Sequence, residues 1–576
     1  MNAAIPAAFA LLAYYLGYRF YSKFLANRIF SLQDVPTPAH RYNDGVDYVP
    51  TQKMVLFGHH YASIAGLAPM LGPAVAVIWG WFPAMMWVVL GALFVGCVHD
   101  FGSLVLSLRA KGMSIGKVAE GIIGTRAKTL FHLIIFFLVA LAMGVFVYVI
   151  AFLFSPAPSP EQSAIHFPQA VTPSFGLMLI AAAIGWLGYK RNIPWKILTP
   201  IGFVLLLALM FISKNESFLT TTGLNNPAAA PGVEGWSRIL LFYAFLASVL
   251  PVWSLLQPRD FLNSLLLYFG LTGLYVGFFI LQPHFVAPAV RVHPPGAPGL
   301  FPFVFIVIAC GAASGFHSLV ASGTTAKQIN KEKDARFIGY GGMIGESLLG
   351  LVAVLATTAG LLNSQAWLRQ YADWQSVQGL GAKVGVFIQG SSTFLQPLGI
   401  DRYTGASFIS LIVVSYALTS LDSATRLLRY NLEEIGETFR LKFFQNRYIS
   451  SLGAVLAIGF FAFYKMDGRP AGLALWRLFG TTNQLLAGLA LLAVTLYLLQ
   501  RGKPWYYSGL PMIFMLISTL KAMAENIAEF FTKSEWPLFS VGIFLFILAA
   551  WLIVEAAIAV VSHYRSGEVK QSLEVF

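Results

Sequence analysis

Among the ionisable residues that lie inside long apolar stretches, where a charge needs a specific reason, we single out four: His99, Asp100, His317 and Asp422. An aspartate at the centre of a membrane helix costs about 2.5–3.5 kcal/mol on insertion scales. Histidine titrates near neutral pH, and an acid in apolar surroundings can hold and release a proton. These residue types therefore predict a proton relay, in which at least one side chain takes up a proton. The alternative is structural: the carboxylates hydrogen-bond neighbouring helices and never titrate. Glu346 also lies inside an apolar stretch, at a depth in its expected span comparable to that of the four candidates.

Glycines and prolines interrupt the apolar stretch that begins near residue 54. Proline removes an amide donor and clashes with the preceding turn, so we predict that this helix unwinds near Gly66–Pro69. A second break is predicted at Ser248–Trp253, around Pro251. The helix N-terminus after such a break suits a carboxylate, and unwound carbonyls suit a cation. The candidate substrate-binding residues are His59, His60, Ser63, Gly66, Pro69, Ser248, Pro251, Trp253 and Ser314.

Small and polar residues mark two further apolar stretches. Residues 310–315 are almost all small, and Ser314 places a hydroxyl among them. Residues 481–484, Thr-Thr-Asn-Gln, are unusually polar for the middle of a span. Small residues permit close helix packing, so both segments have a structural interpretation beside the functional one.

Metal, haem and catalytic chemistry have weaker support. His59 and His60 are adjacent, so on a helix they point about 100° apart and do not share one ion easily. We therefore predict no metal and no cofactor. A His-rich membrane redox protein, or one that binds a metal or haem, is the alternative class. It requires a catalytic constellation that the sequence does not display, so we expect no enzyme. The sequence also lacks the GxxxxGK[ST] signature of ATP hydrolysis.

The composition determines which elements position these residues. The chain has 576 residues, of which 57% are hydrophobic and 11% charged, against about 25% charged in soluble domains. Such a chain cannot cover a soluble exterior, so we exclude a soluble enzyme, a disordered chain and a nucleic-acid-binding domain. We predict an all-α polytopic membrane protein with about 15 transmembrane helices. They are expected at 2–22, 54–80, 82–108, 128–154, 174–190, 194–213, 238–257, 260–282, 302–321, 338–362, 404–428, 448–465, 472–499, 506–524 and 537–562.

Basic residues set the expected orientation. The net charge is +13, and most Lys and Arg fall in loops on one side if the N-terminus is outside. The positive-inside rule then places the N-terminus outside and the C-terminus in the cytoplasm. The apolar segment Val384–Ile400 contains Gly390 and Pro397, and we expect a re-entrant or surface element there. Counting this segment as a span would reverse the orientation of every later helix, against the positive-inside rule.

The two expected breaks suggest a duplication. Pro69 and Pro251 lie five spans apart, so their helices run in opposite directions through the membrane. This arrangement is typical of two five-helix inverted repeats whose first helices are both discontinuous. The repeats would be 54–213 and 238–428. Residues 1–53 would add a helix and a cytoplasmic loop, and residues 448–576 would add further helices.

Motifs spread over most of the chain resemble the carbon starvation protein A family. They are Asp44–Pro50, Phe57–Gly66, Gly72–Pro73, His99–Phe101, Gln257–Asp260, Gly315–Val320, Ser322–Gln328, Leu421–Arg426 and Leu478–Gln484. The resemblance implies an inner-membrane transporter of the amino acid–polyamine–organocation type, with the five-plus-five fold. It implies uptake of a small molecule, a peptide or pyruvate, when carbon is scarce, with a proton as coupling ion. The expected partners are this substrate, the coupling ion and membrane lipid, without nucleic acid. The choice between peptide and pyruvate, between proton and sodium, and the oligomeric state stay open.

Overall fold

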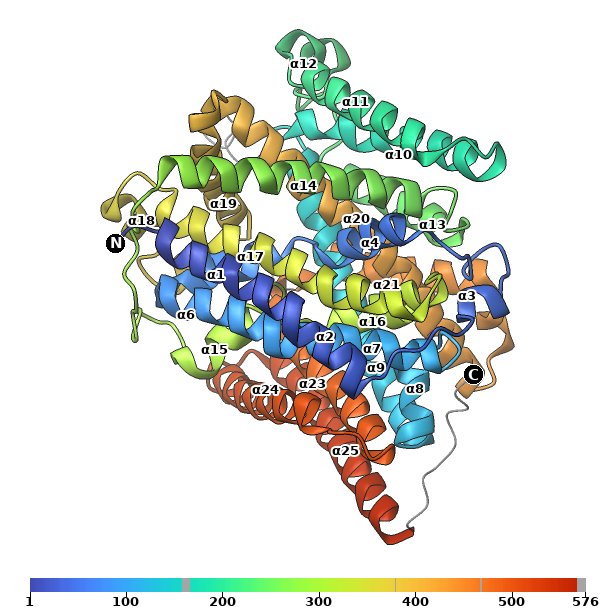
Figure 1. Ribbon diagram of the computed structural model, residues 1–576. Helices are drawn as coiled ribbons and strands as arrows, with labels where there is room; N and C mark the ends of the chain where they lie inside the picture. The colour runs from blue at the N-terminus through green and yellow to red at the C-terminus, as the bar shows by residue number, and fades with distance from the viewer. Residues whose placement is uncertain (158–165, 379, 467–468, 567–576) are drawn as a thin grey trace.

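The computed structural model describes residues 1–157, 166–378, 380–466 and 469–566. Most of these residues are helical, and several long helices lie side by side in one bundle (Figure 1). Ten described helices are long and apolar enough to cross a membrane, or eleven if the bent pair Lys53–Ile64 and Ala68–Trp79 counts as one span. The all-α, multi-pass architecture is thus confirmed, whereas fewer helices than the predicted 15 meet this length and apolarity.

The helices begin with α1 Ala4–Leu16, α2 Ser22–Phe24, α3 Pro38–Arg41, α4 Lys53–Ile64, α5 Ala68–Ala76, α6 Trp81–Met86, α7 Cys97–Arg109, α8 Ile115–Ile122, α9 Thr125–Phe154, α10 Val171–Lys190, α11 Trp195–Ser213, α12 Glu216–Thr222 and α13 Val233–Val249. They continue with α14 Leu256–Leu281, α15 Leu300–Val307, α16 Gly315–Gly323, α17 Gly341–Ala359, α18 Ser364–Gln370, α19 Leu380–Leu395, α20 Arg402–Thr438, α21 Arg447–Phe463, α22 Ala471–Ala474, α23 Trp476–Gln500, α24 Tyr506–Thr532 and α25 Trp536–Ser566. Strands β1 Lys465–Met466 and β2 Arg469–Pro470 form an antiparallel ribbon. Wider π-helical turns join some of these helices end to end: η1 Gly17–Tyr21, η2 Leu25–Ile29, η4 Trp87–Gly96 and η9 Arg336–Tyr340.

The predicted break at Gly66–Pro69 is present. Helix α4 ends at Ile64, α5 begins at Ala68, and the two halves meet at 46°. Pro69 lies in the first turn of α5, where its missing N–H costs nothing. A Cβ on Gly66 would lie 2.5 Å from the Ser420 Oγ, so only glycine lets this break approach α20 so closely.

The second predicted break is wrong. Helix α13 ends at Val249 and α14 begins at Leu256, so Ser248 and Pro251 lie at a helix end and in a connection. Proline ends a helix here because it cannot continue the hydrogen-bond ladder. The second discontinuous helix is instead the pair α15 and α16, which residues 308–314 separate. Gly311 in that gap has φ +89, a conformation that favours glycine.

The segment predicted as a re-entrant or surface element is a buried helix. Helix α19 packs against α5, α14, α17 and α20, and its Val384, Phe387 and Ile388 are buried. The surface alternative is therefore wrong. The cause is length: 16 residues are fewer than the roughly 20 that a perpendicular span needs, although the helix is apolar enough to pack inside.

Long helices hold the two broken helices in place. Helices α9 and α20 pack on each other, α13 packs on α9, and α21 packs on α20. Helix α14 contacts α4 and α20, while α23 contacts α16 and α9. The amino terminus lies at one end of the bundle and α3 at the opposite end (Figure 1).

Candidate functional site

The two helix breaks face one small cavity. Gly66 and Ala68 from the first break and Cys310 from the second line a space of about 20 Å³, closed by Phe316 and Ser420. This volume is close to that of one water-sized site. The site therefore has backbone from two unwound helices, which leaves amide and carbonyl groups near a cavity inside the bundle.

A larger cavity adjoins this one. It measures about 140 Å³ and shares Ala68 and Cys310 with the small cavity. Its wall extends to Pro298, in the connection before α15, and to Trp374 and Gln378, in the segment after α18. We call this cavity the vestibule. It connects the helix breaks with the end of the bundle opposite α3.

Three helices bring four ionisable side chains together beside the second break, and we call this group the carboxylate–histidine cluster. The Asp100 Oδ1 lies 2.7 Å from the His99 Nδ1, and its Oδ2 lies 2.9 Å from the His317 Nδ1. The other ring nitrogen of His317, Nε2, lies 3.2 Å from the Glu346 Oε2. All four side chains are fully buried. One imidazole thus connects two carboxylates, a geometry in which a proton on the ring or on either acid changes the charge of the whole cluster.

Two of the residues predicted to relay protons are in direct contact, and a third ionisable residue joins them. Asp100 on α7 and His317 on α16 meet directly. Glu346 on α17 completes the cluster, but sequence reasoning had assigned it no role. The signal was available, because a glutamate in an apolar run needs a partner as much as an aspartate does.

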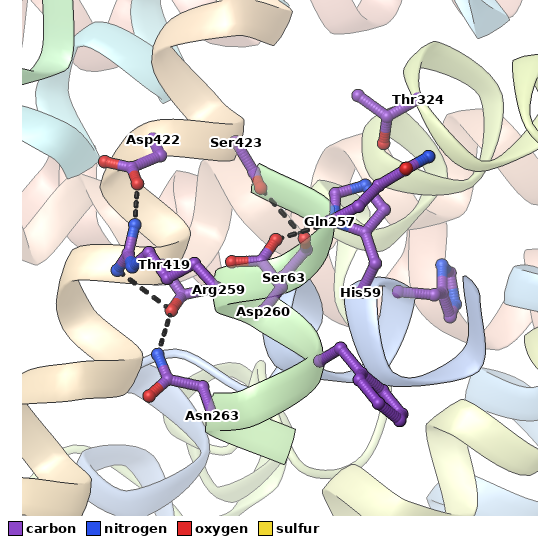
Figure 2. Close-up of polar contacts among 12 residues, drawn as sticks. His59, Ser63, Gln257, Arg259, Asp260, Asn263, Thr324, Thr419, Asp422 and Ser423 are labelled. Carbon is purple, nitrogen blue, oxygen red and sulfur yellow. Dashed lines mark hydrogen bonds and ion pairs between the residues drawn. The ribbon is translucent and has the colours of Figure 1, made fainter. Parts of the chain in front are cut away.

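Asp422 lies in a different network. It forms a close ion pair with Arg259 and accepts a hydrogen bond of 2.5 Å from the Tyr243 OH. Arg259 also donates to the Thr419 Oγ1 at 3.1 Å, and Asn263 donates to the same oxygen at 2.7 Å (Figure 2). The pair joins α13, α14 and α20. Sequence reasoning missed Arg259, although an arginine inside an apolar run calls for a buried acid.

The candidate residues of α4 have separate partners. The His59 Nδ1 lies 2.6 Å from the Asp260 Oδ2, and the His60 Nδ1 lies 2.8 Å from the Thr325 Oγ1. The two imidazoles thus point to different neighbours, as their adjacency on a helix predicted. The Ser63 Oγ lies 2.8 Å from the Ser423 Oγ (Figure 2). These contacts tie α4 to α14, to the segment after α16, and to α20.

Ser314 lies at the second break and contacts the polar segment of α23. Its Oγ donates to the Asn483 Oδ1 at 3.3 Å, and the same oxygen accepts from the Phe316 N–H at 3.0 Å. Asn483 thus satisfies an amide that the start of α16 leaves free. The polar residues predicted in the middle of this span hold the broken helix in place.

Trp253 contacts a loop at the end of the bundle instead of a mid-span break. Its Nε1 donates to the Gly45 carbonyl at 3.2 Å, and the Val252 N–H donates to the Val46 carbonyl at 3.1 Å. Ser248 donates to the Phe245 carbonyl at 2.8 Å in its own helix. The structure therefore places Ser248, Pro251 and Trp253 apart from the cavity at Gly66.

Ion pairs hold the same loop to α20. Asp47 lies 2.8 Å from the Arg426 Nη1 and 3.2 Å from the Arg429 Nη2. We call residues 44–48 with these two arginines the latch. Burial alone would raise the pKa of the Asp47 carboxyl, but the charges of Arg429 and Arg426 outweigh burial and hold that pKa below its usual range. A carboxylate with a lowered pKa stabilises the folded state above its ordinary pKa and loses that contribution only as the pH falls through the lowered value. The latch is thus charged at neutral pH.

One group among the described residues has the spacing for a shared metal ion. Ligand atoms of Cys310, His317 and Glu346 all lie within 4.8 Å of one another. The His317–Glu346 ion pair and the hydrogen bond of 3.1 Å from the Cys310 Sγ to the Ser314 Oγ account for this proximity without an ion.

The chain resembles known proteins over most of its length. The family model described as carbon starvation protein CstA matches residues 2–379 and 370–522. The peptide transporter CstA of Campylobacter jejuni is 32% identical, over 90% of this chain and 80% of that protein. The peptide transporter CstA of Escherichia coli is 32% identical over 91% of this chain and 81% of its own length. The pyruvate/proton symporter BtsT of Escherichia coli is 30% identical over 88% of this chain and 80% of its own length.

Solved structures match more distantly. The Eremococcus coleocola manganese transporter, in complex with an aromatic bis-isothiourea substituted compound, aligns with a TM-score of 0.47 and 12% identity over 90% of this chain and 99% of that chain. MhsT in complex with L-phenylalanine aligns with a TM-score of 0.42 and 12% identity over 88% of this chain and 99% of that chain.

Proposed function

The chain belongs to the carbon starvation protein CstA family, and we propose that it is a secondary active transporter for a small carboxylate-bearing nutrient, a peptide or pyruvate. In this proposal the protein imports its substrate across the inner membrane when carbon is scarce, and a proton drives the uptake. The observation that carries the proposal is the carboxylate–histidine cluster beside two broken helices. Relatives named as a peptide transporter and a pyruvate/proton symporter support the substrate class and the coupling ion.

The substrate site is placed at the helix breaks. Gly66, Pro69 and Ser314 lie at the two breaks, and the vestibule leads from them to one end of the bundle. Helix α16 begins at Gly315, beside the second break, and the partial positive charge of a helix N-terminus suits a carboxylate. We place His59, His60 and Ser63 beside this site because they lie on α4, which ends at the first break, and their contacts with α14, α20 and Thr325 hold α4 in position.

Proton binding is assigned first to Asp100, with His99 and His317 as its partners. Glu346 holds the far nitrogen of His317, so protonation of one acid weakens the attraction that joins α7, α16 and α17. Because α16 is half of a broken helix, this change acts directly on an element next to the substrate. Asp422 has a second role in coupling: taking up a proton would release Arg259 and loosen α14 from α20.

The helix order supports a five-plus-five inverted repeat with boundaries other than those predicted from the sequence. The first repeat would consist of α4–α5, the span of α6, η4 and α7, and then α9, α13 and α14. The second would consist of α15–α16, α17, α20, α21 and α23. Two parallels support this division: the fourth helices, α13 and α21, each have 17 residues, and each packs on the long third helix of its own repeat. Helices α10 to α12 would then be an insertion.

We assign the latch to the cytoplasmic end of the transport pathway. In this conformation the latch is closed, and the vestibule opens toward the outside. We expect Asp47→Asn to slow the reaction of Cys310 with a methanethiosulfonate reagent added outside, by about tenfold, in a Cys97→Ser background. Cys310 lines the vestibule, and loss of the charged hydrogen bonds of Asp47 shifts the population toward the opposite conformation. Asp34→Asn is the matched control, because Asp34 forms an exposed pair with Lys333. Equal rates in all three proteins would contradict the assignment.

Orientation follows from the basic loops, with the N-terminus outside and the C-terminus in the cytoplasm. We expect an impermeant maleimide to label Leu362→Cys in intact cells and to leave Lys333→Cys unmodified, in a Cys310→Ser background. Leu362 is 83% exposed and the Lys333 side chain is 59% exposed, so access to the membrane side decides the result. Labelling of Lys333→Cys in intact cells would show that this loop lies outside, which contradicts the predicted orientation.

Reconstitution tests the substrate class. Purified protein in liposomes should take up labelled pyruvate or labelled dialanine when the outside is made acidic, and the unlabelled true substrate should compete. Uptake that depends on external sodium at fixed pH would show that sodium, and not the proton, is the coupling ion. Failure to take up either compound under any gradient would contradict the proposal.

A further inference from the structure

One face of α9 forms a large part of the wall of the small cavity at the two helix breaks. The lining residues on this helix are Leu138, Val139, Ala142, Met143 and Phe146. They are spaced three or four residues apart or are direct neighbours, so they lie on one side of the helix. All five side chains are buried. Helix α9 thus supplies an apolar wall to the same cavity that Gly66 and Cys310 line from the two breaks.

The small cavity offers no partner for a charged group. None of the described residues that line it is an aspartate, glutamate, lysine, arginine or histidine. Its two polar side chains already have partners: the Ser420 Oγ donates to the Ser63 carbonyl at 3.3 Å, and the Cys310 Sγ donates to the Ser314 Oγ at 3.1 Å. A charged group placed there would lose its hydration without gaining an ionic partner. The small cavity therefore suits an apolar group.

Three residues form the boundary between the small cavity and the vestibule. Ala68, Cys310 and Phe479 line both spaces. The Phe479 ring stacks on Trp476 of the vestibule wall, with 4.4 Å between the ring centres. A ligand that enters through the vestibule therefore reaches the small cavity with one end only.

The volume of the small cavity limits the size of that end. About 20 Å³ holds one group of roughly the size of a water molecule, such as a methyl group. Phe146 closes the side next to the first break, because a Cβ added to Gly66 would lie 3.3 Å from the Phe146 Cε2. Ala142, one turn before Phe146, contributes only a methyl group to the wall. A longer side chain at Ala142 would therefore fill the space, and a shorter one at Phe146 would extend it.

We propose that the small cavity binds the apolar end of the transported substrate, that it admits a group of about methyl size, and that Phe146 and Ala142 set this limit. The substrate carboxylate stays outside the small cavity, beside the start of α16. The methyl group of pyruvate or the side chain of an alanine residue meets this limit, whereas a longer aliphatic chain does not. This inference rests on the proposed function, because it takes the site at the helix breaks as the site of transport.

Competition for uptake tests the size limit with the full-length protein in liposomes. Uptake of labelled pyruvate is inhibited by unlabelled pyruvate or 2-oxobutyrate, and uptake of labelled dialanine by dialanine or the dipeptide of 2-aminobutyrate. The longer compound of each pair has one more methylene in each aliphatic group. In the parent it should need about a tenfold higher concentration for half-inhibition, since one methylene in a filled apolar pocket changes selectivity about 10- to 200-fold.

Two variants change the cavity in opposite directions. Phe146→Leu extends the space, so the half-inhibiting concentrations of the short and long compounds should become similar. Ala142→Val fills the space, so the short compound should need about a tenfold higher concentration than in the parent. Phe137→Leu is the matched control, because Phe137 lies on the same helix but contacts Phe461 and does not line the cavity. Its selectivity should equal that of the parent.

The outcomes separate this inference from the proposed function. Equal inhibition by the short and long compounds in the parent would overturn the size limit while uptake itself continues. Parental selectivity in Phe146→Leu together with parental inhibition in Ala142→Val would do the same, and either variant decides the result if the other does not fold. If the parent takes up neither labelled compound, the proposed function fails and this inference fails with it.

Discussion

Replacing Asp100 by asparagine is expected to abolish accumulation of substrate against its gradient and to leave exchange of labelled for unlabelled substrate intact. Asparagine keeps the shape and most hydrogen bonds of Asp100 with His99 and His317, but it cannot release a proton. Binding therefore survives while coupling fails. In liposomes with a pH difference of one unit, the parent should concentrate substrate about tenfold, since one pH unit is about 1.4 kcal/mol. The variant should stop at equal concentrations.

The controls separate coupling from folding. Asp401→Asn changes the same chemical group at an exposed helix cap, where the Asp401 Oδ1 accepts from the Thr404 N–H. Asparagine caps a helix as well as aspartate does, so this variant should accumulate substrate like the parent. Glu346→Gln should resemble Asp100→Asn if the two acids share one proton through His317. Full accumulation by Asp100→Asn with unchanged pH dependence would show that the cluster is structural.

For the Arg259–Asp422 ion pair we expect a large loss of stability when either residue alone is replaced, and recovery of that stability when both are replaced. Arg259→Leu leaves a buried carboxylate without its cation, and Asp422→Leu leaves a buried guanidinium without its anion. Breaking a buried pair on one side typically costs about 3–5 kcal/mol, whereas removing both charges is often close to neutral. We expect low yield and a lowered melting temperature in both single variants, and a melting temperature near the parent in Arg259→Leu/Asp422→Leu.

The double variant also tests the role of Asp422 in coupling. If the pair only stabilises the fold, the recovered protein should accumulate substrate. If Asp422 takes up a transported proton, the recovered protein should bind and exchange substrate but fail to accumulate it. Losses that simply add in the double variant would show that the two side chains do not act as a pair.

Local chemistry decided which parts of the fold could be predicted. The break at Gly66 could be predicted from the sequence because glycine and proline change the conformation and hydrogen bonding of the backbone at their own positions. The same rule misled at Pro251, since proline ends a helix as readily as it kinks one, and only the packing of α13 and α14 decides between the two. The break at residues 308–314 has no proline, so its composition resembled close packing.

Contacts between distant segments decided the rest. Depth along a span placed Asp100 and His317 at one level, but it did not predict that the two side chains meet. Depth alone gave no direction around the helix, so Asp422 was grouped with them although its side chain meets Arg259 and Tyr243. A single sequence likewise could not place Asp47 against Arg426, because these residues lie far apart in the chain and meet only through the fold.

Proton movement that accompanies substrate tests the central claim most directly. Liposomes that contain the purified protein and a trapped pH-sensitive dye are mixed with substrate at equal pH on both sides. Proton-coupled import predicts acidification of the interior when substrate is added outside, at a rate that follows substrate uptake and disappears in Asp100→Asn. Substrate uptake of normal rate without any change of internal pH would contradict the account.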